Sequence, residues 1–236
     1  QFVNILSDHS KSKPISTDLV LDLGNSRTCG ILLEKSTSSA SVKLEDAFPL
    51  KIRNFSNPSH FQSGLIDSGI EFTQAEFGNN FLVAKSGNKN SFIWPGIVRV
   101  GNEAIEIQKK DTGAGLRSGL SSAKRYLWDM DKTSHDWNMK TTETGTPHIL
   151  QECFKLLSDK GEFSKDGLEE LNSEFRYPRS SLVMFMLAEL ICHAFVQINN
   201  PLERLKRPES ELPRYLANII LTFPTATPST EQFILR

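Results

Sequence analysis

The stretch that decides the fold is Asp18-Leu-Val-Leu-Asp-Leu-Gly-Asn-Ser-Arg-Thr-Cys-Gly-Ile-Leu-Leu-Glu34. An apolar run leads into Asp22, Gly24 permits a tight turn, and a second apolar run follows. Two apolar runs separated by small polar residues predict a β-hairpin. We expect strands at 18–23 and 28–34, the first of them buried in a mixed or parallel sheet.

The predicted turn carries groups that bind phosphate. Gly24 lets the backbone approach a ligand closely, and Asp22 is placed to hold a hydrated Mg²⁺ directly or through water. Four successive backbone N–H groups can point into one concavity and receive phosphate oxygens, those of Asn25, Ser26, Arg27 and Thr28. The hydroxyls of Ser26 and Thr28 and the guanidinium of Arg27 add to these donors. The alternative is a plain hairpin turn, since Asp, Gly and Asn favour turns for conformational reasons alone.

Composition limits the class of protein. The chain has 236 residues, 38% of them hydrophobic and 23% charged, which is typical of a soluble globular protein. Its net charge of −1 favours neither nucleic acid nor an anionic membrane as partner. Cys29, Cys153 and Cys192 are far apart, and the five histidines form no pair at metal-binding intervals. We therefore expect free thiols, no metal site on His or Cys, and a cytoplasmic protein, without excluding secretion.

The chain divides into three predicted parts. Residues 1–17 lack the apolar core of a signal peptide and are expected to form a flexible lead-in. Residues 18–52 and 176–236 are expected to form the base of an α/β domain, and 53–175 an inserted subdomain. Because the chain starts with Gln and stops within a predicted helix, we expect a fragment of a longer protein.

Several shorter elements are also predicted. A third strand is expected near 41–52. Ile97 to Val100 predicts a strand, Gly101-Asn102 a hairpin turn, and Ala104 to Ile107 the returning strand. A helix is expected to begin at Ala123, capped by Ser121 or Ser122.

The longest predicted helix covers about Ser181 to Ile198 and is apolar nearly all round. Its polar exceptions are four residues apart on one face, which predicts a partly exposed stripe formed by Glu189, His193 and Gln197. We do not expect a membrane span, because the run is short and carries a glutamate near its middle. A strand at 216–223 and a last helix capped by Ser229 or Thr230 complete the prediction.

Three separated segments resemble the Hsp70–actin–sugar kinase superfamily. Residues 22–28 resemble its phosphate-1 motif. Ser122-Ala-Lys-Arg-Tyr-Leu127 resembles the Hsp70 segment Ala-Lys-Arg-Leu-Ile, and Ile219-Ile-Leu-Thr-Phe-Pro224 resembles the Hsp70 strand that ends in a proline. The order of hairpin, inserted subdomain with lysine, apolar helix, strand and proline also matches. The resemblance implies an RNase H-like, actin/Hsp70-like ATPase lobe with a mixed sheet flanked by helices.

Four blocks are similar to the SrfB family of bacterial virulence factors. They span nearly the whole chain and are residues 22–30, 94–101, 119–129 and 221–228. Members of that family are much longer than 236 residues, in line with a truncated N-terminal piece. The family name indicates virulence, and nothing in the residues themselves demonstrates it.

The superfamily resemblance implies a role for each motif residue. Asp22 would organise Mg²⁺, and the backbone from Gly24 to Arg27 with the Ser26 hydroxyl would hold the β- and γ-phosphates of ATP or ADP. Lys124 would stabilise charge on the transferring phosphoryl group and place the attacking water. Pro224 would couple the site to domain movement.

The chain departs from the superfamily pattern in two respects. Asn25-Ser26-Arg27 replaces the Hsp70 residues Thr-Thr-Asn/Lys, and the second phosphate motif and adenosine motif are absent. We expect a slow ATPase when full length, completed by the rest of its own chain, and an inactive fragment when alone. Two alternatives stay open: a non-catalytic interaction scaffold with unidentified protein partners, and a small-molecule kinase resembling type III pantothenate kinases.

Overall fold

A computed structural model describes most of the predicted base and parts of the predicted insertion. The described residues are 13–35, 43–57, 59–72, 98–110, 120–130, 178–224 and 227–235. Most of the lead-in predicted at 1–17 and Cys153 lie outside them. The described residues form a mixed α/β structure with several sheets and a few helices.

The central sheet has the strand order β10-β1-β2-β3. Strand β6 pairs with the first residues of β2, and β3 pairs with later residues of β2. Strand β1 pairs antiparallel with β2 and parallel with β10, and β2 pairs antiparallel with β3 and β6. These strands are β1 (Ile15–Leu23), β2 (Arg27–Lys35), β3 (Ala47–Pro49), β6 (Leu65–Asp67) and β10 (Arg214–Thr222). The predicted hairpin and the predicted strand before Pro224 are confirmed.

Alternation explains why β1 occupies the middle of this sheet. Leu19, Leu21 and Leu23 are buried on one face, whereas Asp22 is exposed on the other. Side chains along a strand point alternately to opposite faces, so the three leucines share the core side. The carboxylate at the end of the strand consequently faces away from the core.

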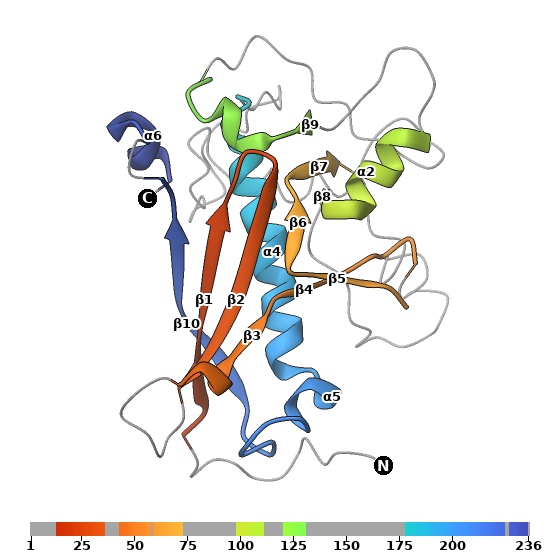
Figure 1. The fold of residues 1–236 in the computed structure, drawn as a ribbon, viewed down its shortest axis with the longest axis vertical. Coiled ribbons are helices and arrows are strands. Elements are labelled where there is room, and N and C mark those ends of the chain that lie inside the picture. Colours follow the sequence, from red (N-terminus) through yellow and green to blue (C-terminus); the bar gives the residue numbers. More distant parts are fainter. Residues whose placement is uncertain are drawn as a thin grey trace, which may run out of the picture.

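Helix α4 (Ser181–Asn199) covers the core side of the sheet, behind β1 and β2 in Figure 1. It contacts β4, β8 and β10, and buries Leu182, Met186 and Leu190 in the core shared with the sheet. Among the described residues it is the one helix long and apolar enough to cross a membrane. However, 56% of its most apolar stretch is buried inside the protein. That burial agrees with the predicted core helix, because a buried core helix can be as long and as apolar as a membrane span.

The predicted exposure of the polar stripe is wrong, because Glu189, His193 and Gln197 are buried. Gln197 donates to the Pro49 carbonyl (3.0 Å) and accepts from the Lys51 N–H (2.7 Å). The Arg53 N–H donates to His193 Nδ1 (3.3 Å). These side chains supply partners for backbone groups that would otherwise be buried without hydrogen bonds. The polar stripe of α4 therefore holds residues 49–53 in place through hydrogen bonds.

The strand predicted near 41–52 is divided in the structure. A 3₁₀ helix, η1 (Leu44–Asp46), precedes β3, and β4 (Lys51–Arg53) belongs to a different sheet with β5 (Phe61–Ser63). The division falls at Leu50, whose side chain is buried and whose N–H donates to the Gly30 carbonyl (2.9 Å). The chain turns away at this anchored residue and changes sheets.

The hairpin predicted over 97–107 is wrong in its second half. Strand β8 (Val98–Val100) forms, but helix α2 (Gly101–Lys110) follows it directly. Gly101 turns the chain with a φ of +67°, and the buried carboxylate of Glu103 accepts from the Phe55 and Ser56 N–H groups. Such contacts with a distant loop are not visible in the local sequence pattern.

A three-stranded sheet lies beside the central one, with the order β8-β7-β9. It consists of β8, β7 (Gly69–Phe72) and β9 (Leu120–Ser121). After β9 the chain forms a single 3₁₀ turn, η2 (Ala123–Tyr126), in place of the predicted longer helix, and neither predicted serine caps it through its side chain. Of the range 53–175 predicted as an insertion, β6 joins the central sheet, while β7, β8 and β9 form this second sheet.

Two short helices complete the described structure. They are α5 (Pro201–Arg204) and α6 (Ser229–Ile234), and Figure 1 shows α6 beyond the end of β10. The last predicted helix is confirmed, but Pro228 occupies its N-cap position and no side chain caps it.

Candidate functional site

The turn between β1 and β2 lies at the edge of the sheet where two parallel strands end. Asp22 of β1 stands beside Thr222 of β10, and the Thr222 hydroxyl donates to Asp22 Oδ1 (3.0 Å). Pro224 is exposed just beyond β10 at this edge, and its carbonyl accepts from the Thr227 N–H (2.9 Å). Ligands of open α/β sheets bind outside the carboxyl ends of parallel strands, so this edge is the first place to look for a site.

The turn itself requires glycine at its first position. A Cβ at Gly24 would lie 2.2 Å from the Arg27 carbonyl oxygen, which is closer than any side chain tolerates. Asn25, Ser26 and Arg27 are exposed. The hairpin register pairs Leu23 with Thr28, so Gly24 and Arg27 face each other across the turn. The exposed residues of the turn can be reached by a ligand.

Ser68, which follows β6, holds the turn from behind. Its hydroxyl donates to the Gly24 carbonyl (2.9 Å), and its N–H donates to the Ser26 carbonyl (2.9 Å). The hydroxyls of Ser68 and Thr28 are also hydrogen-bonded (2.9 Å). The Thr28 hydroxyl, predicted to face phosphate, is accordingly buried against Ser68.

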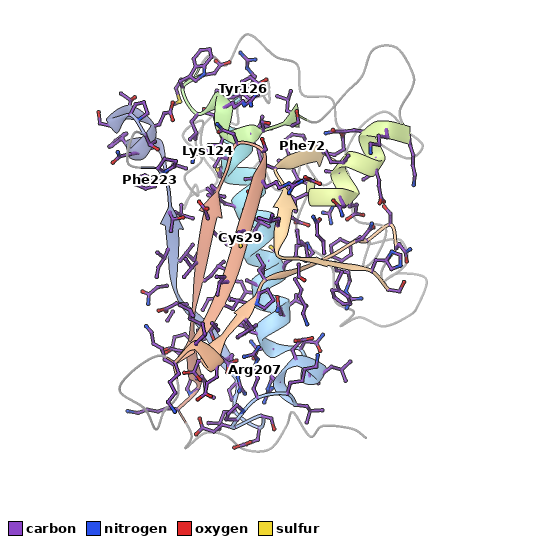
Figure 2. The ribbon with its side chains drawn as sticks, viewed as in Figure 1. Cys29, Phe72, Lys124, Tyr126, Arg207 and Phe223 are labelled. Atoms are coloured by element: carbon purple, nitrogen blue, oxygen red, sulfur yellow. The ribbon has the colours of Figure 1, made fainter. Side chains whose placement is uncertain are left out.

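Lys124 reaches the same turn from η2, as Figure 2 shows at the tip of the β1–β2 hairpin. The side chain is only 8% exposed, and its Nζ donates to the Leu23 carbonyl (2.6 Å). The Ser122 N–H donates to the Ser68 carbonyl (2.8 Å), which fixes the segment leading into η2. The fold thus brings the predicted lysine to the predicted turn from 101 residues away.

The remaining charges around the turn are exposed. Arg27 and Asp67 form a long ion pair of 3.9 Å at the surface, an interaction of small energy. No group of three or more metal-binding side chains occurs in the ranges that the structure describes. Asp22 offers a single carboxylate, a donor set that fits Mg²⁺ held largely by water and nucleotide phosphates, and not by the protein alone.

Other reactive side chains belong to a different part of the molecule. Burial raises the pKa of the Cys192 thiol to about 11, so this thiol is not an activated nucleophile. Burial also lowers the pKa of His193, while the adjacent Glu189 carboxylate acts in the opposite direction. His193 stacks on Phe55 at 5.5 Å between ring centroids and serves the packing of α4.

The sequence-predicted site residues are brought together at one edge, with one exception in orientation. The exposed turn contains Gly24, Asn25, Ser26 and Arg27, with Asp22, Lys124 and Pro224 at the same edge, whereas the Thr28 hydroxyl is buried. Sequence reasoning missed Ser68, and it gave Ser122 and Thr222, which lie in the segments already quoted, no contact at this edge. The signal for Ser68 was the Ser68-Gly69 interruption of the apolar run, which indicates a turn.

Comparison with known proteins places the chain in a family. The family model described as virulence factor SrfB matches residues 2–236. The chain belongs to the SrfB family. Curated proteins give no match to this SrfB-family chain. The family description refers to virulence and names no chemistry, so the function of this member is argued from its site.

Proposed function

We propose that this chain carries the first phosphate-binding lobe of an ATP-binding protein of the actin/Hsp70-like type, which acts as a slow ATPase when full length. One observation carries the proposal. A glycine-dependent turn with exposed residues has two charged groups beside it: the Asp22 carboxylate, and the Lys124 ammonium on the Leu23 carbonyl. Backbone N–H groups in a concave turn bind phosphate, and flanking groups of opposite charge suit a magnesium–phosphate ligand.

The topology of the central sheet supports the proposal. Strands β1, β2 and β3 form an antiparallel meander, and β10 joins β1 in parallel after the long helix α4. The superfamily resemblance of the sequence implies the same order of elements. The turn then occupies the position at which that resemblance expects the first phosphate-binding hairpin.

In the proposed site, each residue has a distinct task. Bound Mg²⁺ would supply charge neutralisation between the phosphates, with Asp22 orienting its water ligands. The turn N–H groups would receive phosphate oxygens, and the Ser26 hydroxyl would add one donor. Pro224, beyond the strand that contacts Asp22 through Thr222, would pass a change at the site into β10 and the chain after it.

Lys124 would change partners when a nucleotide binds. Its Nζ is bonded to the Leu23 carbonyl at the end of β1, immediately before the turn. A γ-phosphate is a stronger acceptor for an ammonium than a neutral carbonyl, because both partners are then charged. Lys124 would therefore leave Leu23 and stabilise the charge that develops during phosphoryl transfer.

Calorimetric titration of the full-length protein with Mg-ATP tests the proposal. Asp22→Ala is expected to weaken Mg-ATP binding about tenfold or more, because the magnesium waters lose their acceptor. Lys124→Ala is expected to retain binding and to slow hydrolysis about a hundredfold, since its contact strengthens in the transition state. Lys206→Ala, on the exposed surface near α5, serves as the matched lysine control. A full-length protein that releases no heat with any nucleotide would overturn the proposal.

A non-catalytic scaffold is the second candidate, and the Lys124–Leu23 bond favours it. A buried lysine bonded to a backbone carbonyl already has a structural task. If the protein is a scaffold, Lys124→Ala lowers the melting temperature, and no nucleotide raises it in the wild type. If the ATPase proposal holds, Mg-ATP raises the melting temperature of the wild type through mass action.

A further inference from the structure

We propose that Ser68 is a positioning residue that orients the phosphate-binding face of the β1–β2 turn, an inference that rests on the proposed function. No motif pointed to Ser68, and it lies outside the hairpin it contacts. It is only 2% exposed, so it does not touch a ligand itself. Its role is carried out through the backbone of the turn.

Three carbonyl groups around the turn are held from within the protein. Ser68 binds the Gly24 carbonyl through its hydroxyl and the Ser26 carbonyl through its N–H, both at 2.9 Å. Lys124 binds the Leu23 carbonyl at 2.6 Å. Because the donors come from residues after β6 and in η2, the carbonyl directions are set by tertiary contacts and not by the hairpin alone.

Fixing these carbonyls also fixes the neighbouring N–H groups. Every described peptide bond is trans, and in a planar trans peptide the N–H points opposite to the C=O of the same unit. The N–H groups of Asn25 and Arg27, in the peptide units whose carbonyls Ser68 binds, therefore point away from Ser68. The buried serine thus sets the direction of two backbone donors of the exposed turn, the kind of donor that binds an anion.

The hydrogen bonds of Ser68 link this orientation to the lysine segment. The single proton of the Ser68 hydroxyl goes to Gly24, so the Thr28 hydroxyl is the donor in the bond between Thr28 and Ser68. The Ser68 carbonyl accepts from the N–H of Ser122, two residues before Lys124. One residue therefore sets both the turn and the position from which Lys124 approaches it.

The test compares two buried serines in the full-length protein. Ser68→Ala removes the hydroxyl that holds Gly24, whereas Ser180→Ala removes a buried hydroxyl at the start of α4 that donates to the Met130 sulfur. Backbone ¹⁵N relaxation of residues 24–27 reports whether the turn is held. Titration with Mg-ATP, and separately with inorganic tripolyphosphate, reports whether the held turn binds phosphate.

We expect Ser68→Ala to lower the order parameters of residues 24–27 and to weaken binding of both probes about tenfold. Ser180→Ala should leave the order of the turn and both affinities unchanged. Unchanged order at 24–27 in Ser68→Ala overturns the inference. If the wild type binds neither probe, the proposed function fails, and the relaxation data alone decide the role of Ser68.

A second pair of variants covers the case in which Ser68→Ala does not fold. Ser68→Thr and Ser68→Val have the same shape and differ by the hydroxyl, so any shared loss comes from the added bulk. We expect Ser68→Thr to keep the ordered turn better than Ser68→Val. Equal behaviour of the two variants would overturn a role for the hydroxyl.

Discussion

At the scale of single residues, the backbone at Gly24 constrains the chain most closely. The exposed residues Asn25, Ser26 and Arg27 form a turn only because the chain doubles back tightly at this glycine. Any side chain here would meet the backbone carbonyl of Arg27, which cannot move without breaking the start of β2. The glycine is thus required by the shape of the turn, whatever ligand the turn binds.

Gly24→Ala is therefore expected to destabilise the protein by about 1–3 kcal/mol, because the turn must distort to admit a Cβ. Chemical denaturation of the variant and the wild type measures this difference. Asn25→Ala, at the exposed neighbouring position, is the matched control and should stay within about 0.5 kcal/mol of the wild type. Equal stability of Gly24→Ala and wild type would contradict the observed turn geometry.

At the scale of elements, α4 acts through its polar stripe as well as its apolar surface. Glu189 pairs with the buried Arg99 of β8 (3.1 Å) and lies 3.4 Å from His193. His193 accepts from the Arg53 N–H through Nδ1, so Nε2 carries the proton and faces the glutamate. Protonation of His193 would turn Nδ1 into a donor, so the Arg53 N–H would lose its acceptor, and it would add a positive charge close to Arg99.

The buried histidine predicts a pH dependence of stability. Burial holds the pKa of His193 below its ordinary value, so the unfolded chain takes up a proton more readily than the folded protein. Stability should be complete above about pH 6.5 and decline as the pH falls below that value. Glu189 and Glu103 oppose this decline, and Arg99 reinforces it.

Thermal denaturation between pH 5 and pH 8 checks this expectation, because this pH range includes the ordinary histidine pKa of about 6.5. His193→Asn retains an acceptor for the Arg53 N–H but cannot take up the proton, so its melting temperature should depend less on pH. His60→Asn, at an exposed site, should keep the wild-type dependence. A wild-type slope in His193→Asn would show that another group is responsible.

At the scale of the whole molecule, Arg214 joins β10 to β2, the two strands on either side of β1. This buried guanidinium at the start of β10 lies 3.3 Å from Glu34 at the end of β2. It also donates to three backbone carbonyls of the preceding loop, those of Pro208, Glu209 and Leu212. The contact links two residues that are 180 positions apart in the chain.

Arg214→Ala should destabilise the protein by about 3–5 kcal/mol, because it leaves the buried carboxylate of Glu34 without its closest partner. Equilibrium urea denaturation provides the measurement. Lys206→Ala is the control: its ion pair with Glu203 is similar in length (3.0 Å), but the lysine is 63% exposed. It should cost less than about 1 kcal/mol, and equal losses in the two variants would contradict the difference in burial.

The sequence by itself determined the elements whose signals are local. Alternation and a glycine turn specified the hairpin at 18–34, a long and mostly apolar run specified α4, and proline marked the end of β10. Each signal arises from neighbours along the chain, which is why it can be recognised without a structure. The candidate residues Asp22 and Gly24 belong to this group.

Only the tertiary structure decided which distant groups meet. It placed Lys124 and Ser68 on the carbonyl side of the turn, buried the polar stripe of α4 against residues 49–53, and made 101–110 a helix. These outcomes depend on backbone groups that must find hydrogen-bond partners wherever packing buries them. The partners lie tens of residues away in the chain, so no local pattern specifies them.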